Sequence, residues 1–288
     1  MFDYPSKDDI ERISMDLLMQ SKSIDIFPTP VDSIVRFVNI KIDNSIDLSN
    51  VDDDYIRKLS SDSAIDFLSS LNQVRGVLDR KDKVILLDKS QLPCRQNFVK
   101  LHETGHEILT WQKDFLLFSD DDITLNINTT EEFEAEANYF ASTILFQNDR
   151  FEILTKKFKL GISAPMTLAK KFGASIHSAM RKYVECSPKR CALLVLENIP
   201  IIGCNPICDK RDLFYSENFL ETFGVIDFPE RFGYKWDFVK DCYFGKKINV
   251  RGNISLDTEN GTADFNYHFF NNTYNAFVLI FPIGEEKC

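Results

Sequence analysis

The chain has 288 residues, which is enough for one large domain or for two to three modest ones. Its 44 Asp and Glu outnumber 34 Lys and Arg, and the net charge of −10 argues against binding nucleic acid or anionic membrane over the whole surface. The first residues are acidic and lack an apolar run, so no secretory signal is expected. The apolar run 276–283 is far shorter than the roughly 20 residues of a membrane span. Seven scattered cysteines indicate reduced thiols and a cytoplasmic protein.

The first half of the chain alternates between helical and extended patterns. Residues 6–22 have the apolar spacing of an amphipathic helix, and a Thr-Pro-Val-Asp run predicts that a second helix begins near residue 30. Residues 38–42 alternate as a strand does, and the Asp-, Ser- and Asn-rich stretch 43–63 predicts a loop.

A hairpin is predicted next, with strands at 76–78 and 83–87 around a polar turn. Helical spacing returns at 95–112 and at 130–147, separated by an acidic loop over 119–128.

The character of the sequence changes over 150–191, where ten Lys and Arg stand against two Glu. This stretch has a net charge of +8, so the rest of the chain carries −18. Two helices are expected in it, at 164–172 and 175–186. Beyond residue 191 the sequence is β-rich, with turn signals such as Glu-Asn-Gly between alternating segments.

The most informative segment is His102-Glu103-Thr104-Gly105-His106, in the helix predicted over 95–112. Residues four apart share one face of a helix, so both imidazoles can reach one Zn²⁺ at about 2.0–2.1 Å. Glu103 projects beside that face, near the metal but not on it. This arrangement is typical of metallopeptidases, in which two His hold zinc and the Glu is the general base for the attacking water. The alternative is a solvated helix that carries two incidental His.

A hydrolytic zinc site needs a third protein ligand. We expect Glu134, whose helix carries the small residues Ala137 and Ala141 and can therefore approach the His helix closely. Asn138 shares the face of Glu134. We expect it to hydrogen-bond the nitrogen of a ligand His that does not bind the metal and so to orient that imidazole. Glu136 is the less favoured alternative, because it is rotated by about 200° from Glu134.

Three further readings stay open at this point. The remaining His residues, His177 and His268, are alternative third ligands, but neither has a second candidate ligand near it at helical spacing. The acids at the start of the second helix are also explained by the helix dipole alone.

The sequence from Arg95 to His106, followed by Glu134-Ala135-Glu136-Ala137-Asn138-Tyr139-Phe140-Ala141, resembles the ImmA/IrrE family of zinc metallopeptidases. The resemblance covers roughly residues 10–150. Relatives usually end the second motif in a Leu-Met-Pro-like run, where this chain has Leu145-Phe146-Gln147.

The resemblance implies an α+β fold with a minimal gluzincin-like peptidase core of helices and a small β-sheet. It implies that His102, His106 and Glu134 bind zinc and that Glu103 is the catalytic base. Known relatives cleave helix-turn-helix repressors, which implies a protein substrate of that kind and a role in stress response or mobile-element regulation. The predicted domains are a metallopeptidase domain at 1–150, a basic helical segment at 151–190 and a β-rich domain of unknown role at 191–288.

The basic segment 167–183 resembles a helix-turn-helix, with a Gly turn before a Ser that caps its second helix. DNA binding is one interpretation, but we favour a helical extension whose Lys and Arg face solvent or acidic parts of the protein. The cysteines at 186, 191, 204 and 208 lack the spacing of a zinc knuckle, and a thiolate of Cys94 masking the zinc is also disfavoured.

The leading hypothesis is therefore a zinc-dependent endopeptidase, with substrate binding by strand addition near Leu78 or Leu87. Tyr139 and Arg95 are candidates for stabilising the oxyanion. The competing hypothesis is a regulatory protein, weakly catalytic or not catalytic, that binds DNA or a partner protein. No membrane partner is expected.

Overall fold

The structure is a computed structural model that describes residues 7–50, 76–79, 82–112, 127–197, 199 and 206–287. The expected loop 119–128 lies almost wholly outside these residues, as do most of 43–63 and Cys204. The fold is α+β and divides into two compact units. The first comprises residues up to 151 together with 171–175, and the second comprises 152–170 and 176–288. The division of the chain into three functional domains stays a prediction.

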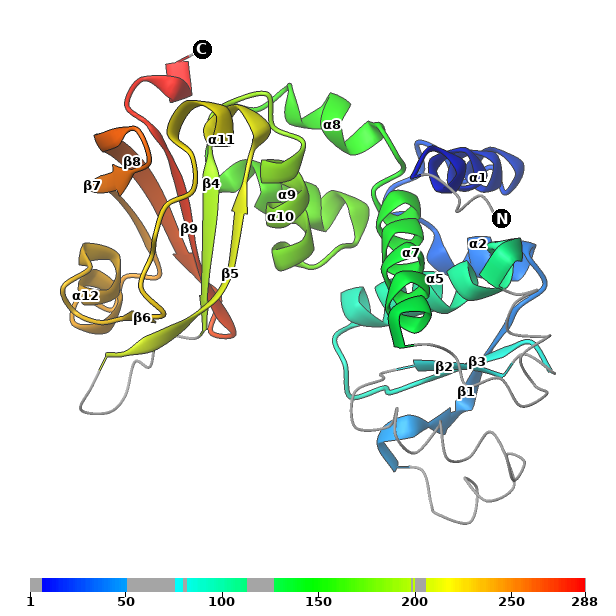
Figure 1. Cartoon of the computed structure of the whole chain (residues 1–288). Coiled ribbons are helices and arrows are strands. Elements are labelled where there is room, and N and C mark those ends of the chain that lie inside the picture. The colour runs from blue at the N-terminus through cyan, green and yellow to red at the C-terminus, as the bar shows by residue number, and fades with distance from the viewer. Residues whose placement is uncertain are drawn as a thin grey trace. The chain divides into compact units, whose positions relative to one another are not determined.

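The described part of the first unit combines helices with a small sheet (Figure 1). The helices among its described residues are α1 (Lys7–Gln20), α2 (Val31–Phe37), α5 (Pro93–Ile108) and α7 (Ile127–Leu145), and a short α8 (Arg150–Thr155) begins at its end. The strands are β1 (Lys41–Asp47), β2 (Gly76–Asp79) and β3 (Val84–Leu87), in the order β1-β3-β2.

The hairpin expected around the polar turn is β2 and β3, which pair antiparallel. The expected strand 38–42 is shifted, because β1 begins at Lys41 and continues to Asp47 through residues expected to form a loop. Parallel pairing of β1 with β3 explains the difference, since a strand partner overrides the weak preferences of Asp, Asn and Ser.

The core of the first unit lies between its helices. Apolar side chains of α7, among them Phe140 and Ile144, are fully buried, as is Leu101 of α5. Just after α7, Gln147 is the last residue of the run Leu145-Phe146-Gln147, which stands where relatives usually have a Leu-Met-Pro-like run. Its side chain is buried and hydrogen-bonds the backbone of Asp25 and Ile26.

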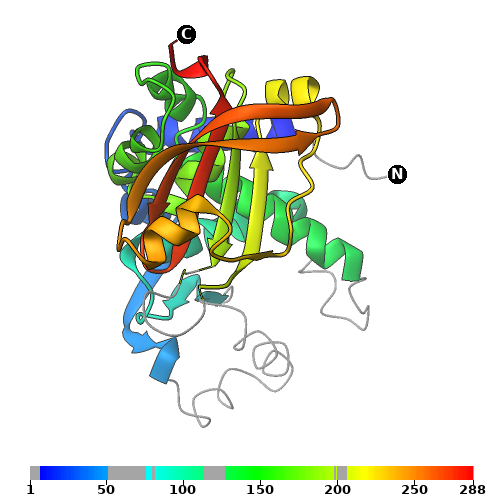
Figure 2. The ribbon, with the colours of Figure 1, turned by 90° about the vertical axis from the view of Figure 1, so that its left-hand side faces the viewer.

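The second unit is built on a six-stranded antiparallel sheet in the order β6-β5-β4-β9-β8-β7. Its strands are β4 (Ala192–Glu197), β5 (Cys208–Tyr215), β6 (Arg231–Phe232), β7 (Asn249–Thr258), β8 (Gly261–Asn271) and β9 (Asn275–Pro282). Figure 2 shows the sheet curling, with the β7–β8 hairpin (orange) bent away from the plane of β4 and β5. The expected β-rich region is thus present.

Helices accompany this sheet. The two helices expected in the basic segment are α9 (Ser163–Phe172) and α10 (Ile176–Glu185), and α10 packs against β4 and β5. The β-rich region also contains α11 (Glu217–Phe223) and α12 (Asp237–Tyr243), which the sequence pattern did not reveal. No helix among the described residues is long and apolar enough to span a bilayer.

Candidate metal centre

The helix that carries the His-Glu-Thr-Gly-His motif is α5. It begins at Pro93, whose ring suits the first helical position, and it ends at Ile108. The helix expected to run to residue 112 is interrupted at Leu109, which adopts an extended conformation (φ −73°, ψ 93°), and residues 110–112 are helical again. The face of α5 that contains the motif is turned inward, so that Glu103, Thr104, Gly105 and His106 are all buried.

The second helix of the site, α7, lies against α5 (Figure 1). Gly105 allows the close approach, because a Cβ atom built at this position would lie 3.3 Å from the Cα of Ala137 and 3.1 Å from the Phe140 ring. Ala137 is itself fully buried. Small residues on both helices therefore bring Glu134 of α7 within reach of the two His of α5.

Three of the expected side chains converge. The Nε2 atoms of His102 and His106 are 3.2 Å apart, and they lie 3.2 Å and 3.3 Å from the two carboxylate oxygens of Glu134. The ligating atoms of the three residues all lie within 4.8 Å of one another, an arrangement that can hold a metal ion. Two imidazoles and one carboxylate form the donor set of a hydrolytic zinc site, so these residues fit zinc.

The outer nitrogen of each imidazole faces an amide oxygen. His102 Nδ1 lies 3.1 Å from Asn138 Oδ1, and His106 Nδ1 lies 2.8 Å from Gln112 Oε1. Such contacts fix the orientation of a ligating imidazole and direct its other nitrogen toward the metal.

Electrostatics link the three converging residues. Burial lowers the pKa of His102, but its hydrogen bond to Glu134 and the negative charges of Glu103 and Glu134 outweigh burial and raise that pKa. The pKa of Glu134 is lowered well below its ordinary value by its hydrogen bonds to the two His. Without metal, the site is held together by attraction between the imidazoles and the carboxylate.

Glu103 lies beside the cluster. Its side chain is buried, and burial raises its pKa, with the charges of His102 and His106 acting in the opposite direction. Its carboxylate accepts a hydrogen bond from the backbone N–H of Leu78 in β2. A carboxylate with a raised pKa next to a candidate metal site is suited to exchange protons.

The remaining candidates do not join this cluster. Glu136 accepts hydrogen bonds from Trp111 Nε1 (2.8 Å) and Gln112 Nε2 (2.6 Å). His177 lies 3.2 Å from Asp212 on β5, and His268 Nε2 lies 2.8 Å from Glu286. The hydroxyl of Tyr139 donates to Glu11 of α1.

The sequence patterns did not identify Trp111 and Gln112, which lie shortly after the end of α5, as residues of the site. Gln112 contacts both His106 and Glu136, and it is fully buried. The one signal in the sequence is a Trp-Gln pair within six residues of the second motif His, which no general spacing rule recognises.

Residues 62–182 match the family model of the IrrE N-terminal-like domain. The match begins later than the resemblance drawn from the motifs and extends through most of α10. No curated protein matches the chain.

Among solved structures, a Mycobacterium tuberculosis transcriptional regulator has a similar fold. The TM-score is 0.55 and the sequence identity is 12%, and the comparison covers 97% of this chain and 90% of that chain. At this identity the similarity concerns the fold alone.

Proposed function

We propose that this chain, which belongs to the ImmA/IrrE family through its residues 62–182, is a zinc-dependent endopeptidase. The observation that carries the proposal is the convergence of His102, His106 and Glu134 beside a buried Glu103. The family match supports a metallopeptidase independently of that geometry.

In the proposed site His102, His106 and Glu134 hold the metal. Bound zinc would polarise the peptide carbonyl and make water more acidic. Glu103 accepts the proton of the attacking water and passes it to the leaving amine. Burial favours protonation of Glu103 and therefore makes it an effective proton acceptor at this position.

The edge of the small sheet offers a place for the substrate. In the order β1-β3-β2, β2 is an outer strand, whereas β3 is paired on both sides. Leu87 lies on β3 and therefore cannot receive an added strand, which corrects one of the two positions expected from the sequence. Leu78 lies on β2, and its backbone N–H is hydrogen-bonded to Glu103. A peptide that extends the sheet along β2 would pass next to the general base.

We further propose a helix-turn-helix repressor as the substrate and a cytoplasmic role in stress response or mobile-element regulation. The family resemblance supports this substrate class, and the similar fold of a transcriptional regulator agrees with a regulatory role.

The test uses a helix-turn-helix repressor from the same genome as the candidate substrate. The zinc-loaded chain should cut it into fragments that mass spectrometry identifies, and Glu103→Gln should lower the rate by about 10²–10⁴-fold, because the general base is lost. Glu132→Gln, an exposed neutralisation on α7, is the matched control and should cleave normally. Cleavage by Glu103→Gln at the wild-type rate would contradict the mechanism.

A further inference from the structure

We propose that Gln112, held by Glu136, is the positioning residue for His106 and selects the tautomer that presents Nε2 to the metal. The inference deepens the proposed function and rests on it for the identity of the metal. Neither residue touches the cluster of His102, His106 and Glu134 through a ligating atom, so both act through His106.

The break after α5 brings Gln112 to this place. Leu109 leaves the helix in an extended conformation, while its N–H still bonds the carbonyl oxygen of Gly105 (2.9 Å). Residues 110–112 are helical again, and the N–H of Gln112 bonds the carbonyl oxygen of Leu109 (3.0 Å). The Gln112 side chain consequently lies against His106, which is six positions earlier, and it is fully buried.

Two hydrogen bonds fix which way the Gln112 amide points. Its Nε2 donates to Glu136 Oε2 (2.6 Å) and to the carbonyl oxygen of Phe133 (3.1 Å). Both partners are acceptors, because a backbone carbonyl has no proton and Glu136 Oε2 also accepts from Trp111 Nε1, which can only donate. A flipped amide would set its own oxygen against two acceptors, so the observed orientation is the one that satisfies the buried group.

This orientation decides the tautomer of His106. Gln112 Oε1 lies 2.8 Å from Nδ1 of the imidazole, and an amide oxygen can only accept a hydrogen bond. Nδ1 must therefore carry a proton, so in the neutral imidazole the lone pair is on Nε2, the nitrogen that faces Glu134 and His102. A donor that binds zinc requires this lone pair.

Glu136 completes the arrangement. Its Oε2 also accepts a hydrogen bond from Trp111 Nε1 (2.8 Å), so Trp111 and Gln112 both donate to the same carboxylate on α7. The Gln112 amide links this carboxylate to His106, whereas in carboxylate–histidine–zinc sites the carboxylate bonds the ligand directly. The helix that supplies the ligand Glu134 thus also orients the ligand His106.

The corresponding contact of His102 is more exposed. Its partner Asn138 is accessible to solvent, where water competes for the same nitrogen, whereas Gln112 is not accessible at all. We therefore expect Gln112 to contribute more to zinc affinity than Asn138.

The test measures Zn²⁺ affinity of the full chain by competition with a chromogenic chelator. Gln112→Met keeps the size of the side chain but removes the acceptor, and it should weaken Zn²⁺ binding by about 10–100-fold. Glu136→Gln should weaken it less, because Gln112 keeps its contact with His106 but loses the charged partner. Long-range proton–nitrogen NMR of the zinc-loaded wild type should show His106 protonated at Nδ1 and bound through Nε2.

Gln147→Met is the matched control. Gln147 is a fully buried glutamine of the same unit, and its amide likewise makes three hydrogen bonds, but they go to Asp25, Ile26 and Thr29. Both Met variants should lose stability, and only Gln112→Met should lose Zn²⁺ affinity. Zinc binding by folded Gln112→Met at wild-type affinity would overturn the inference, as would an equal loss in Gln147→Met.

If Gln112→Met does not fold, Glu136→Gln takes its place in the test. Weaker Zn²⁺ binding by Glu136→Gln than by Gln147→Met would support the positioning role, and wild-type Zn²⁺ affinity of Glu136→Gln would overturn it. A wild-type chain that fails to bind Zn²⁺ would instead overturn the proposed function. Wild-type binding with unchanged variants would leave the proposed function standing and remove the positioning role alone.

Discussion

Glu103 is an acid in a place that is unfavourable for a charge. Its side chain is buried, and burial raises its pKa above the ordinary value of 4.5. An acid whose pKa is raised by folding destabilises the folded state at pH values above its ordinary pKa. Groups of this kind concentrate at functional sites, where the loss of stability accompanies a chemical role.

The metal-free protein should therefore tolerate neutralisation of this residue. At about pH 7, Glu103→Gln should be at least as stable as the wild type, because it removes a buried charge and its amide oxygen still accepts from Leu78 N–H. The difference should vanish as the pH falls below 4.5, where the unfolded-state carboxylate is also protonated. Thermal unfolding in the presence of a chelator measures both values, and a clear loss of stability at neutral pH would contradict this account of Glu103.

At the level of single residues, the sequence predicted the three converging residues better than the residues that hydrogen-bond them. The four-residue spacing of His102 and His106 follows from helix geometry, and Glu134 follows from a second helix with small residues on one face. The contact with Gln112 depends on the extended conformation of Leu109, which interrupts the helix before it resumes at residues 110–112. Helical periodicity carries no information on such a break, so the pattern predicted one uninterrupted helix.

At the level of elements, the site depends on how closely α5 and α7 approach each other. The Cβ atom of an alanine at position 105 would meet Phe140 at 3.1 Å and Ala137 at 3.3 Å, so the two helices would have to shift by a few tenths of an ångström. A valine would add two methyl groups to the same contact. Because α7 carries Glu134, any separation of the helices moves a ligand away from His102 and His106.

We expect Zn²⁺ affinity to fall in the order wild type, Gly105→Ala, Gly105→Val. Alanine improves helix propensity by up to about 1 kcal/mol, which offsets part of the steric cost in stability but does nothing for the ligand geometry. Chelator competition gives the affinities, and thermal unfolding gives the stabilities. A Gly105→Val protein that binds Zn²⁺ as tightly as the wild type would show that the approach of these helices does not limit the site.

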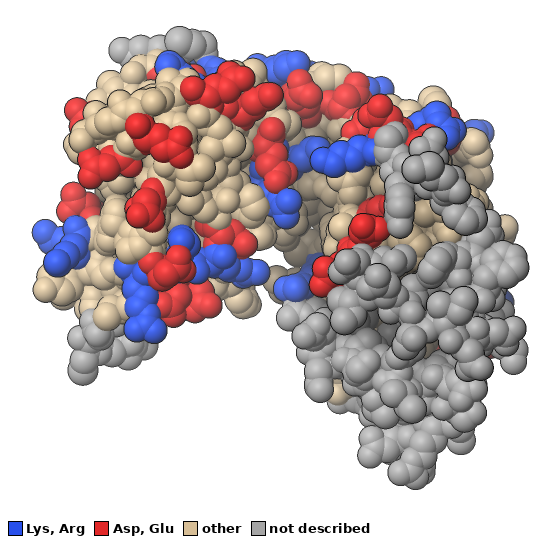
Figure 3. Space-filling model, in the orientation of Figure 1, with Lys and Arg blue, Asp and Glu red and all other residues tan. Residues whose placement is uncertain are grey.

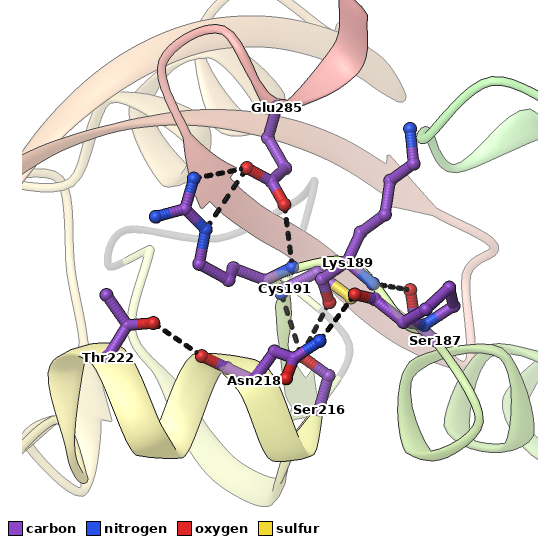
Figure 4. A network of polar contacts seen from close by, with 9 residues as sticks. Ser187, Lys189, Cys191, Ser216, Asn218, Thr222 and Glu285 are labelled. Carbon is purple, nitrogen blue, oxygen red and sulfur yellow. Dashed lines mark hydrogen bonds and ion pairs between the residues drawn. The ribbon is translucent and has the colours of Figure 1, made fainter. Parts of the chain in front are cut away.

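In the second unit, a polar network holds the segment that leads into β4 (Figure 4). The Arg190 guanidinium lies 2.7 Å from one carboxylate oxygen of Glu285. The backbone N–H of Arg190 donates to the other oxygen of the same carboxylate at 3.0 Å. Ser216 before α11 accepts from Cys191 N–H and donates to the carbonyl oxygen of Lys189. The C-terminal end of the described chain is thereby tied to the start of β4 and to α11.

This network predicts a pH dependence of stability. Burial raises the pKa of Glu285, but the hydrogen bonds and charge of Arg190 outweigh burial and lower it. The ion pair of Glu285 with Arg190 therefore stabilises the folded state at pH values above 4.5, the ordinary pKa of the Glu285 carboxyl. This stabilisation is lost as the pH falls through the lowered pKa of Glu285 in the folded state. Glu285→Gln should cost about 1–2 kcal/mol at neutral pH, since Arg190 is partly exposed, and should flatten the acid limb of the stability curve. Denaturant unfolding between about pH 3 and 7 tests this, and an unchanged acid limb would contradict it.

The elements that the sequence predicted are those with a strong repeating pattern. The amphipathic helices α1, α9 and α10 match their expected positions closely, and the hairpin β2–β3 follows from its polar turn. The strand β5, with Lys, Arg and Asp along it, and the short helices α11 and α12 went unrecognised. Their formation depends on the sheet and on the aromatic core beneath it, which includes Phe219 and Phe238.

At the level of the whole molecule, we expect the charge distribution to disfavour DNA as the main partner. On the face in Figure 3, Lys and Arg are interspersed with Asp and Glu. The helix that would read DNA in a helix-turn-helix, α10, packs on the sheet of its own unit, and Arg181 bonds Glu185 and lies over the Phe214 ring. These contacts support the interpretation that basic residues of 150–191 serve packing.

We therefore expect no tight binding of duplex DNA by the protein alone at physiological salt. Replacing Lys170, Lys171, Arg181 and Lys182 by Glu should lower stability or partner binding instead, because Arg181 would lose its acidic and aromatic partners. A titration of labelled duplex at several salt concentrations measures the affinity and its salt dependence. A sub-micromolar, sequence-selective complex at about 0.15 M salt would favour the regulatory DNA-binding hypothesis.

If His102, His106 and Glu134 form one zinc site, the purified chain must contain zinc that depends on these residues. Elemental analysis of protein prepared without added metal should give close to one zinc per chain, because the three donors already converge. His102→Ala and His106→Ala should each lose it while remaining folded. Full retention of zinc by both variants would contradict the account.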